Sequence, residues 1–363
     1  MTDLLLFSTV CNLFFQPNPI KLTTLVATPL FLIGCTNNDN DSRYIEKEEV
    51  DEWDQAFMGE GFIGAKSFGI EVQGFELDLD EAFYGYFEME GLEHPLVARI
   101  GNLSIKDHYF ALKIFLNYEE ASFRVLGEDN YVTEFIILVE SGYKIEIPFV
   151  LEIDQIEMDQ TFKLTAGIFI DPNRHAMDLP FEELPWMEQW DNFATVLNFD
   201  LSFGTGSDIV LDASYTEILA RRENQFFANL QVNTDFGVEA FLASDFSIPP
   251  DNLLQVRAGE EVELAFFTNP HVFEETELEN YLILAMLDWQ QIQLNHQPFL
   301  LVDTRGHGYE HPVDHGTFTF TAPTETGFYE FVAIIVSNPT ARNSWQNFVP
   351  LDVANRFTIE VVE

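Results

Sequence analysis

Apolar and polar side chains alternate along much of the chain from residue 66 onward. The alternation is clear in Tyr143-Lys144-Ile145-Glu146-Ile147 and again in Phe357-Thr358-Ile359-Glu360-Val361. A period of two residues, in short segments rich in Val, Ile, Phe, Tyr and Thr, predicts β-strands. The best candidates for amphipathic helices are short, at residues 181–190 and 214–222. The pattern therefore predicts an all-β fold.

The second half of the chain repeats landmarks of the first half in the same order. Ala166 to Pro172 aligns with Ala333 to Pro339 without a gap. Further aligned pairs are 103–106 with 254–257, 129–131 with 279–281, 190–193 with 345–348, and 198–202 with 355–359. Ordered recurrence of this kind predicts an internal duplication. The predicted parts are copy A at 66–203, a linker at 204–224, and copy B at 225–363.

Each copy has room for about seven or eight short strands, which suits a β-sandwich. In copy B, Pro323 to Ala333 resembles the penultimate-strand region of bacterial Ig-like domains, where a turn with Gly leads into an aromatic-rich strand. The resemblance implies two tandem Ig-like β-sandwich domains. It brings no active-site residue with it.

A Trp-x-Asn-Phe element precedes the last predicted strand of each copy. It contains Trp190 and Asn192 in copy A, and Trp345 and Asn347 in copy B. We expect it to close the open end of each sandwich, with the Asn side chain bonding the turn backbone. The alternative is an exposed Trp that stacks on a sugar ring.

An apolar run from Leu22 to Gly34 precedes the β region and ends in Leu32-Ile33-Gly34-Cys35, with Lys21 before it and a polar, acidic stretch after it. A basic residue followed by about a dozen apolar residues is typical of a signal peptide. The segment resembles the lipobox of bacterial lipoprotein precursors. The resemblance implies a signal peptide at 1–34 and a lipid on Cys35. The protein would then be held on the cell membrane and face the outside, or the periplasm of a Gram-negative cell.

Residues 35–65 are acidic and contain several glycines, so we expect the segment that follows the lipid to be a disordered, flexible tether. The only cysteines are Cys11 and Cys35. Both lie in the precursor region or at the lipidation site, which leaves no disulfide in the predicted domains.

The formal net charge of the chain is -44, from 61 acidic and 17 basic residues. Such a chain repels phosphate backbones, which excludes nucleic acid as a partner. The charge is suited to keeping a surface protein soluble, and cation capture is the alternative interpretation.

Copy B contains an insertion with three histidines at four-residue intervals, among glycines and a proline that make a helix unfavourable. The candidate ligands in and beside it are His307, His311, His315, Asp303, Glu310 and Asp314. Imidazoles and carboxylates suit Zn, Cu, Ni or Mn, so the segment could fold around a divalent metal. The alternative is an ordinary polar loop between strands.

The sequence has no nucleophile elbow, no metalloprotease helix motif and no phosphate-binding glycine loop, so we predict no catalytic residue. The predicted function is a non-enzymatic, lipid-anchored binding or structural module of the cell surface. Its partners would be the membrane, through the lipid, and an unidentified protein or glycan of the envelope. The alternatives are a metal-binding surface lipoprotein that uses the histidine loop, and a lipid-anchored glycan hydrolase. No cofactor is expected apart from a metal in the first alternative.

Overall fold

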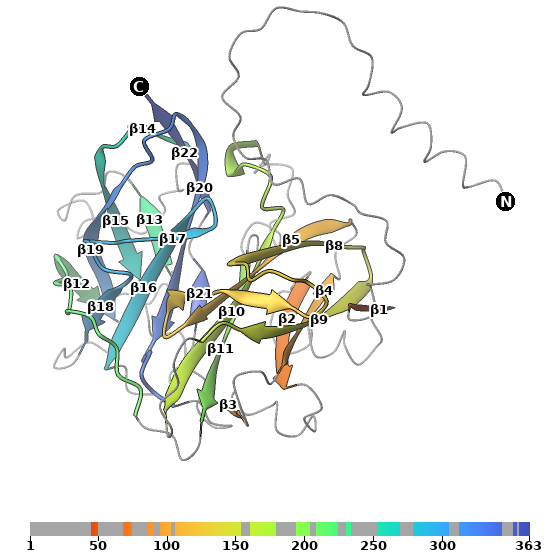
Figure 1. Cartoon of the computed structure of the whole chain (residues 1–363). Coiled ribbons are helices and arrows are strands. Elements are labelled where there is room, and N and C mark those ends of the chain that lie inside the picture. The colour runs from red at the N-terminus through yellow and green to blue at the C-terminus, as the bar shows by residue number, and fades with distance from the viewer. Residues whose placement is uncertain are drawn as a thin grey trace, which may run out of the picture. The chain divides into compact units, whose positions relative to one another are not determined.

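The computed structural model describes residues 45–49, 68–74, 86–89, 95–102, 106–153, 160–178, 194–203, 208–223, 230–233, 253–268, 279–304, 312–342, 351–353 and 356–363. These residues form strands β1 to β22 and one short 3-10 helix, η3 (Ala176–Asp178), which confirms the predicted all-β class (Figure 1). No helix in the described part of the chain is long and apolar enough to cross a membrane.

Domain A, which contains strands β1 to β11, is an Ig-like sandwich of two sheets, called here the outer sheet and the inner sheet. Its outer sheet has the order β1-β9-β4-β2, with β7 also on β9. The bounds are β1 Glu46–Glu49, β9 Tyr143–Leu151, β4 Leu96–Asn102, β2 Phe68–Gly74 and β7 Phe123–Val125. Its inner sheet has the order β3-β11-β10-β5-β6, with β8 also on β5. The bounds are β3 Tyr86–Glu88, β11 Ala194–Ser202, β10 Thr161–Ile170, β5 His108–Leu116, β6 Glu119–Glu120 and β8 Glu134–Val139.

Domain B is a second Ig-like sandwich. Its outer sheet has the order β12-β19-β15-β13. The bounds are β12 Ala220–Glu223, β19 Pro312–Thr321, β15 Glu261–Thr268 and β13 Leu230–Asn233. Its inner sheet has the order β14-β22-β20-β16-β17, with β18 on β16 and β21 on β20. The bounds are β14 Leu253–Arg257, β22 Phe357–Val362, β20 Gly327–Ser337, β16 Asn280–Leu287, β17 Gln290–Ile292, β18 Leu300–Asp303 and β21 Leu351–Val353.

Apart from β7 on β9 in domain A and β21 on β20 in domain B, the described strands of the two domains share one topology. The outer-sheet order of domain A maps onto that of domain B, and so does the inner-sheet order. Even the exceptional parallel pairing recurs, since β3 runs parallel to β11 and β14 runs parallel to β22. This recurrence is what the predicted internal duplication requires.

The strand registers fix which residues correspond between the domains. Leu164 of β10 lies opposite Leu116 of β5, and Phe331 of β20 lies opposite Leu287 of β16. Since β5 and β16 each end there in a two-residue turn, these positions are equivalent. The register confirms the gap-free alignment of Ala166 to Pro172 with Ala333 to Pro339.

Other alignments made from the sequence need correction. Phe199 of β11 corresponds to Phe357 of β22, because each lies opposite the equivalent position of β10 or β20. The sequence alignment there is one residue out of register. Two other pairs do not match equivalent places in the domains. Residues 254–257 lie in β14, whose counterpart is β3, whereas 103–106 come after β4; residues 279–281 open β16, whose counterpart is β5, whereas 129–131 lie between β7 and β8. Alternation alone cannot tell one strand of a sandwich from another.

Two segments expected to lie outside the domains contribute edge strands. β1 lies inside the predicted tether and pairs with β9, while β12 lies inside the predicted linker and pairs with β19. The residues before β12 are extended rather than helical, because Thr216 N–H and Leu219 N–H donate to carbonyls of Leu301 and His315. Backbone groups form these pairs, so a polar sequence can occupy a sheet edge. The other predicted helix, 181–190, lies outside the described residues.

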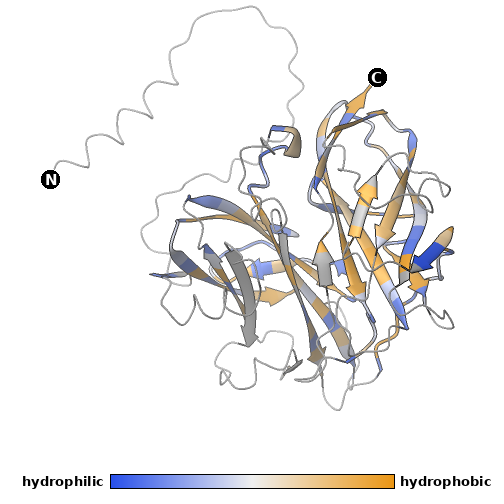
Figure 2. Ribbon diagram, turned by 180° about the vertical axis from the view of Figure 1, so that it is seen from behind, coloured by the Kyte–Doolittle hydropathy of each residue, from blue (hydrophilic) through white to orange (hydrophobic). Residues whose placement is uncertain are grey.

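Each sandwich encloses its own apolar core between its two sheets. Figure 2 shows apolar residues along the strands of both domains. Inward-facing residues of successive strands fill these cores, as the period of two requires. The two cores explain why the chain needs no disulfide in its described part.

Candidate functional site

The inner sheets of the two domains share a third apolar cluster on the faces that point away from their own cores. Domain A contributes Ala111, Phe115, Tyr118 and Phe169, and domain B contributes Leu282, Leu284, Met286, Trp289, Phe299, Leu301, Val332, Ile334 and Val336. Every residue of β10 and of β16 is buried, because one face lies in a sandwich core and the other lies at this interface. The two domains are therefore packed together through their inner sheets.

Two equivalent turns place an aromatic side chain at this interface. Asn117 and Tyr118 have φ of 49° and 68°, and Asp288 and Trp289 have φ of 50° and 64°. Two consecutive residues with positive φ form the tight hairpin turn that matches strand twist, and Asn or Asp is favoured at its first position. The turns thus hold Tyr118 and Trp289 in equivalent positions.

These aromatic side chains form a reciprocal pair of hydrogen bonds across the interface. Tyr118 Oη donates to the Pro339 carbonyl at 2.7 Å, and Trp289 Nε1 donates to the Pro172 carbonyl at 2.9 Å. Pro172 and Pro339 are themselves equivalent positions. Each domain therefore donates one hydrogen bond from its turn aromatic residue and accepts one at the equivalent proline carbonyl. This reciprocity characterises an approximately two-fold, isologous interface.

A buried cation lies on the domain A side of the interface. Lys163 Nζ donates to Asp200 Oδ1 at 2.5 Å and to the Ala341 carbonyl of domain B at 2.5 Å. The side chains of Lys163 and Asp200 are both fully buried. Burial lowers the pKa of Lys163, and the Asp200 carboxylate opposes that shift. Asp200 thus neutralises the buried Lys163 ammonium group, and the bond from that group to Ala341 links the two domains.

The equivalent position in domain B carries the opposite charge. Glu330 accepts hydrogen bonds from Arg356 Nε at 2.6 Å and from Thr358 Oγ1 at 2.6 Å. From domain A it is approached by His175 Nδ1 at 3.1 Å and receives the Ala176 N–H at 3.0 Å. The carboxylate is therefore surrounded by donors from both domains.

Arg356 extends the same network. Its Nη1 donates to the Ile170 carbonyl at 3.0 Å, its Nη2 donates to the Arg174 carbonyl, and its guanidinium lies 4.7 Å from the centre of the Trp289 ring. Burial lowers the pKa of Arg356, and Glu330 opposes that shift. These groups are engaged with protein partners, so the cluster holds the domains together and offers no reacting group to a substrate.

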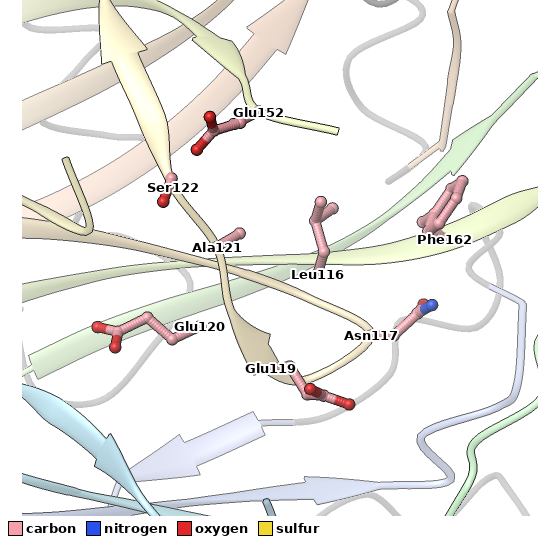
Figure 3. A pocket seen from close by; sticks show the side chains of 8 residues that line it. All are labelled: Leu116, Asn117, Glu119, Glu120, Ala121, Ser122, Glu152 and Phe162. Carbon is pink, nitrogen blue, oxygen red and sulfur yellow. The ribbon is translucent and has the colours of Figure 1, made fainter. Parts of the chain in front are cut away.

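A hollow of about 460 Å³ lies beside the β5–β6 hairpin of domain A (Figure 3). It is lined by Leu116, Asn117, Glu119, Glu120, Ala121, Ser122, Glu152 and Phe162. Glu119 and Glu120 are neighbours in β6, and Figure 3 shows their side chains pointing apart. Glu120 also binds Lys113 Nζ. A glycan hydrolase needs two carboxylates that face each other across the scissile bond, and these two do not.

A second hollow, of about 190 Å³, lies in domain B and contains a single carboxylate, Glu261. Of the two hollows, the first also contains a third carboxylate, Glu152. The hydrolase alternative stays a prediction.

The structure separates the described members of the predicted metal site. Asp314 and His315 follow one another in β19, so their side chains lie on opposite faces of the sheet. Asp314 binds the Arg221 guanidinium, with Nη2 to Oδ2 at 2.7 Å, and accepts the Tyr281 hydroxyl at 2.9 Å. Burial and the Asp314 carboxylate raise the pKa of Tyr281. His315 is buried on the other face and stacks on Phe267, with ring centres 4.9 Å apart.

Asp303 ends β18, and the remaining candidates follow it in the sequence. His307, Glu310 and His311 lie outside the described residues. Among the residues that the structure describes, no three His, Cys, Asp or Glu side chains are grouped so that they could hold a metal ion. Metal binding by the loop itself stays a prediction.

The other singled-out residues also lie outside the described ranges. These are Cys35, Trp190, Asn192, Trp345 and Asn347. Lipidation and the structural role of the Trp-x-Asn-Phe element stay predictions. The interface residues were missed from the sequence, although one signal existed: the run from Tyr281 to Leu287 is apolar throughout and lacks the polar face of an exposed strand.

No protein-family model and no curated protein matches the sequence. Among solved structures, the C-terminal domain of the AgI/II polypeptide BspA of Streptococcus agalactiae aligns over 87% of this chain and 99% of its own, with 9% identity and a TM-score of 0.23. One chain of the CsuC–CsuE chaperone–tip adhesion subunit pre-assembly complex of Acinetobacter baumannii aligns over 82% of this chain and 100% of its own length, with 12% identity and a TM-score of 0.21.

Red sea bream transglutaminase aligns over 82% of this chain, with 8% identity and a TM-score of 0.22, and this chain spans 32% of that protein's length. Such low TM-scores mean that the aligned structures do not superpose as wholes. No conclusion about function follows from these three likenesses.

Proposed function

We propose that this chain is a lipid-anchored module of the cell envelope that binds a partner or supports a structure, without catalysis. The observation that carries the proposal is the isologous interface between the inner sheets, at which Tyr118 and Trp289 exchange equivalent hydrogen bonds. A two-domain body joined in this way holds the described strands of its outer sheets at fixed positions. Fixed surfaces suit display to a partner, because binding then costs little ordering of the protein.

The chemistry of the described residues also supports a role without catalysis. Two buried titratable groups, Lys163 and Glu330, are engaged with partners from both domains. A general acid or base must instead lie within hydrogen-bonding reach of a substrate.

The anchored location follows from the lipobox-like segment and is tested with a pair of cysteine variants. Cys35→Ala in the full chain should abolish incorporation of a labelled fatty acid and move the protein from the membrane fraction to the soluble fraction. Cys11→Ala is the matched control, because it removes the only other cysteine and should leave both properties unchanged. Membrane retention of Cys35→Ala would refute the anchor.

The partner class is tested by retaining cell-envelope material on the unlipidated protein. Prior digestion of the envelope with glycosidases or with proteases separates a glycan partner from a protein partner. Loss of retention after one treatment identifies the class. Failure to retain any envelope component would contradict the binding role and leave only the structural one.

A further inference from the structure

In the part of the chain that the structure describes, the inner sheet of domain A has an open edge at β8. This strand pairs with β5, and no other described strand pairs with it. The residues from Glu134 to Ile137 are partly exposed, and Leu138 is 44% exposed. Tyr109 lies opposite Leu138 in β5 and is 48% exposed. An apolar strand in this position offers its free backbone groups to another chain.

The strand β18 is the equivalent of β8 in domain B. Ile136 of β8 lies opposite Ala111 of β5, and Leu301 of β18 lies opposite Leu282 of β16. Ala111 and Leu282 lie at the same distance from the ends of their strands, so Ile136 and Leu301 occupy equivalent positions. Leu301 belongs to the apolar cluster between the two inner sheets, and Ile136 packs against that cluster. The edge of β8 is therefore continuous with the interface between the domains.

The chain itself covers the edge of β18. An extended segment before β12 runs along it, where Tyr215 forms a parallel bridge with Leu301 and the Thr216 N–H donates to the Leu301 carbonyl at 2.6 Å. Leu301 is only 6% exposed as a result. By equivalence, the backbone of Ile136 faces the open edge of β8. Backbone groups alternate in direction along a strand, so the residues two before and two after Ile136 face the same edge.

The charge near β8 limits what can bind there. Between Leu126 and Ser141 the chain has four acidic residues and no basic one. The whole chain carries a net charge of -44, so a second copy would be repelled. A segment with basic side chains is attracted instead. Its apolar side chains can alternate with polar ones, as Ile209, Leu211 and Ala213 do in the segment before β12.

We propose that the edge of β8 binds an extended segment of a partner protein, with alternating apolar residues and basic side chains, as an added strand of the inner sheet. The inference deepens the proposed binding role and rests on it, because it names the partner as a protein and places the contact at Glu134 to Leu138. Backbone hydrogen bonds to β8 supply affinity, and the exposed side chains of Tyr109 and Leu138 supply apolar contact.

The edge is tested with a fluorescent peptide of residues 208–216 that carries Asp208→Lys and Asp212→Lys. Leu138→Lys in the full chain should weaken its binding about ten-fold, because a charge on an edge strand opposes strand addition and repels the basic peptide. Leu253→Lys in the edge strand β14 is the matched control, since Leu253 is 45% exposed and the change of charge is the same. It should keep the wild-type affinity. Equal affinity of all three proteins, or no binding to the wild type, would overturn the proposal.

Hydrogen exchange locates the contact on the full chain. In the free protein, the amides of Glu134, Ile136 and Leu138 should exchange about ten-fold faster than those of Phe135 and Ile137, which face β5. Saturation with the peptide should remove this difference and leave the amides of β18 unchanged. Equal protection in the free protein would show that the chain already covers this edge and would overturn the proposal.

Retention of envelope material on the unlipidated protein separates this inference from the proposed function. Leu138→Lys should lose the protease-sensitive retention, and Leu253→Lys should keep it. Retention that Leu138→Lys leaves unchanged, or that only glycosidases remove, would overturn the inference while the binding role stands. Absence of retention by the wild type would refute the binding role, while the peptide titration still tests the edge. A wild-type dimer in sedimentation that Leu138→Lys dissociates would identify a second copy as the occupant and overturn the partner assignment.

Discussion

Domains A and B have the same strand order and the same aromatic turn, yet the polar chemistry at their shared interface is reversed. Lys163 in domain A and Glu330 in domain B occupy equivalent positions, and each is buried with a partner of opposite charge. The partner is Asp200 in one domain and Arg356 in the other. The comparison teaches that the architecture does not depend on the sign of the buried charge. It depends on each charge being paired, since an unpaired one is costly in the interior.

The largest effect should come from breaking one of these pairs. Lys163→Met removes the ammonium group that pairs with the fully buried Asp200 carboxylate, so the free energy of unfolding should fall by about 3–5 kcal/mol in urea titrations. Glu330→Gln is the corresponding change in domain B and should cost a similar amount.

The double variant Lys163→Met/Asp200→Asn removes both charges of the domain A pair. It should be more stable than Lys163→Met alone, because no uncompensated carboxylate remains. If the two substitutions were simply additive, the pair would not be coupled, and the comparison between the domains would lose its energetic basis.

The reciprocal hydrogen bonds should give smaller, matched losses. Tyr118→Phe removes the hydroxyl that donates to the Pro339 carbonyl, and Trp289→Phe removes the indole N–H that donates to the Pro172 carbonyl. Loss of a buried donor leaves its acceptor unsatisfied, so each variant should lose about 1–3 kcal/mol of unfolding free energy. Trp289→Phe should lose more, since it also removes ring area beside Arg356. If either variant kept the wild-type free energy of unfolding, the two equivalent hydrogen bonds would not both stabilise the interface.

The smallest effect concerns the first residue of each turn, Asn117 in domain A and Asp288 in domain B. Partial burial raises the pKa of Asp288, and the Glu330 carboxylate adds to that shift. The folded protein therefore holds this proton more tightly than the unfolded chain, and stability declines as the pH rises through the raised pKa.

Asp288→Asn should remove this decline and raise stability near pH 7 by less than about 1 kcal/mol, because the carboxylate is only partly desolvated and the surrounding solvent screens its charge. In domain A the position equivalent to Glu330 carries the cation Lys163, so Asn117→Asp should introduce a smaller decline or none. Denaturation midpoints between pH 4 and 8 would show it; pH-independent differences would contradict the electrostatic cause.

The fold was largely readable from the sequence, whereas the interface was not. Alternation in segments such as Tyr143 to Ile147 predicts strands, and the recurrence of Ala166 to Pro172 at Ala333 to Pro339 gives the correct correspondence of β10 with β20. Alternation also implies one exposed face for each strand, and that rule fails for the inner sheets. Which apolar faces meet depends on the turns that place Tyr118 and Trp289, and turn geometry is set by the folded backbone.

The candidate metal residues also show that sequence spacing does not determine which side chains meet in the fold. Spacing along the chain grouped Asp314 with His315, but the pleat of β19 sends them to opposite faces, and Arg221 binds the carboxylate. Arg221 comes from a segment that was expected to be a linker. A partner that is distant in sequence cannot be inferred from local spacing.

Calorimetric unfolding of the full chain tests most directly whether the inner-sheet interface makes the two domains one body. The account predicts a single transition whose calorimetric and van't Hoff enthalpies agree, and which Lys163→Met moves as a whole to lower temperature. Two separate transitions, of which Lys163→Met moves only one, would show that the domains unfold independently and would contradict the account.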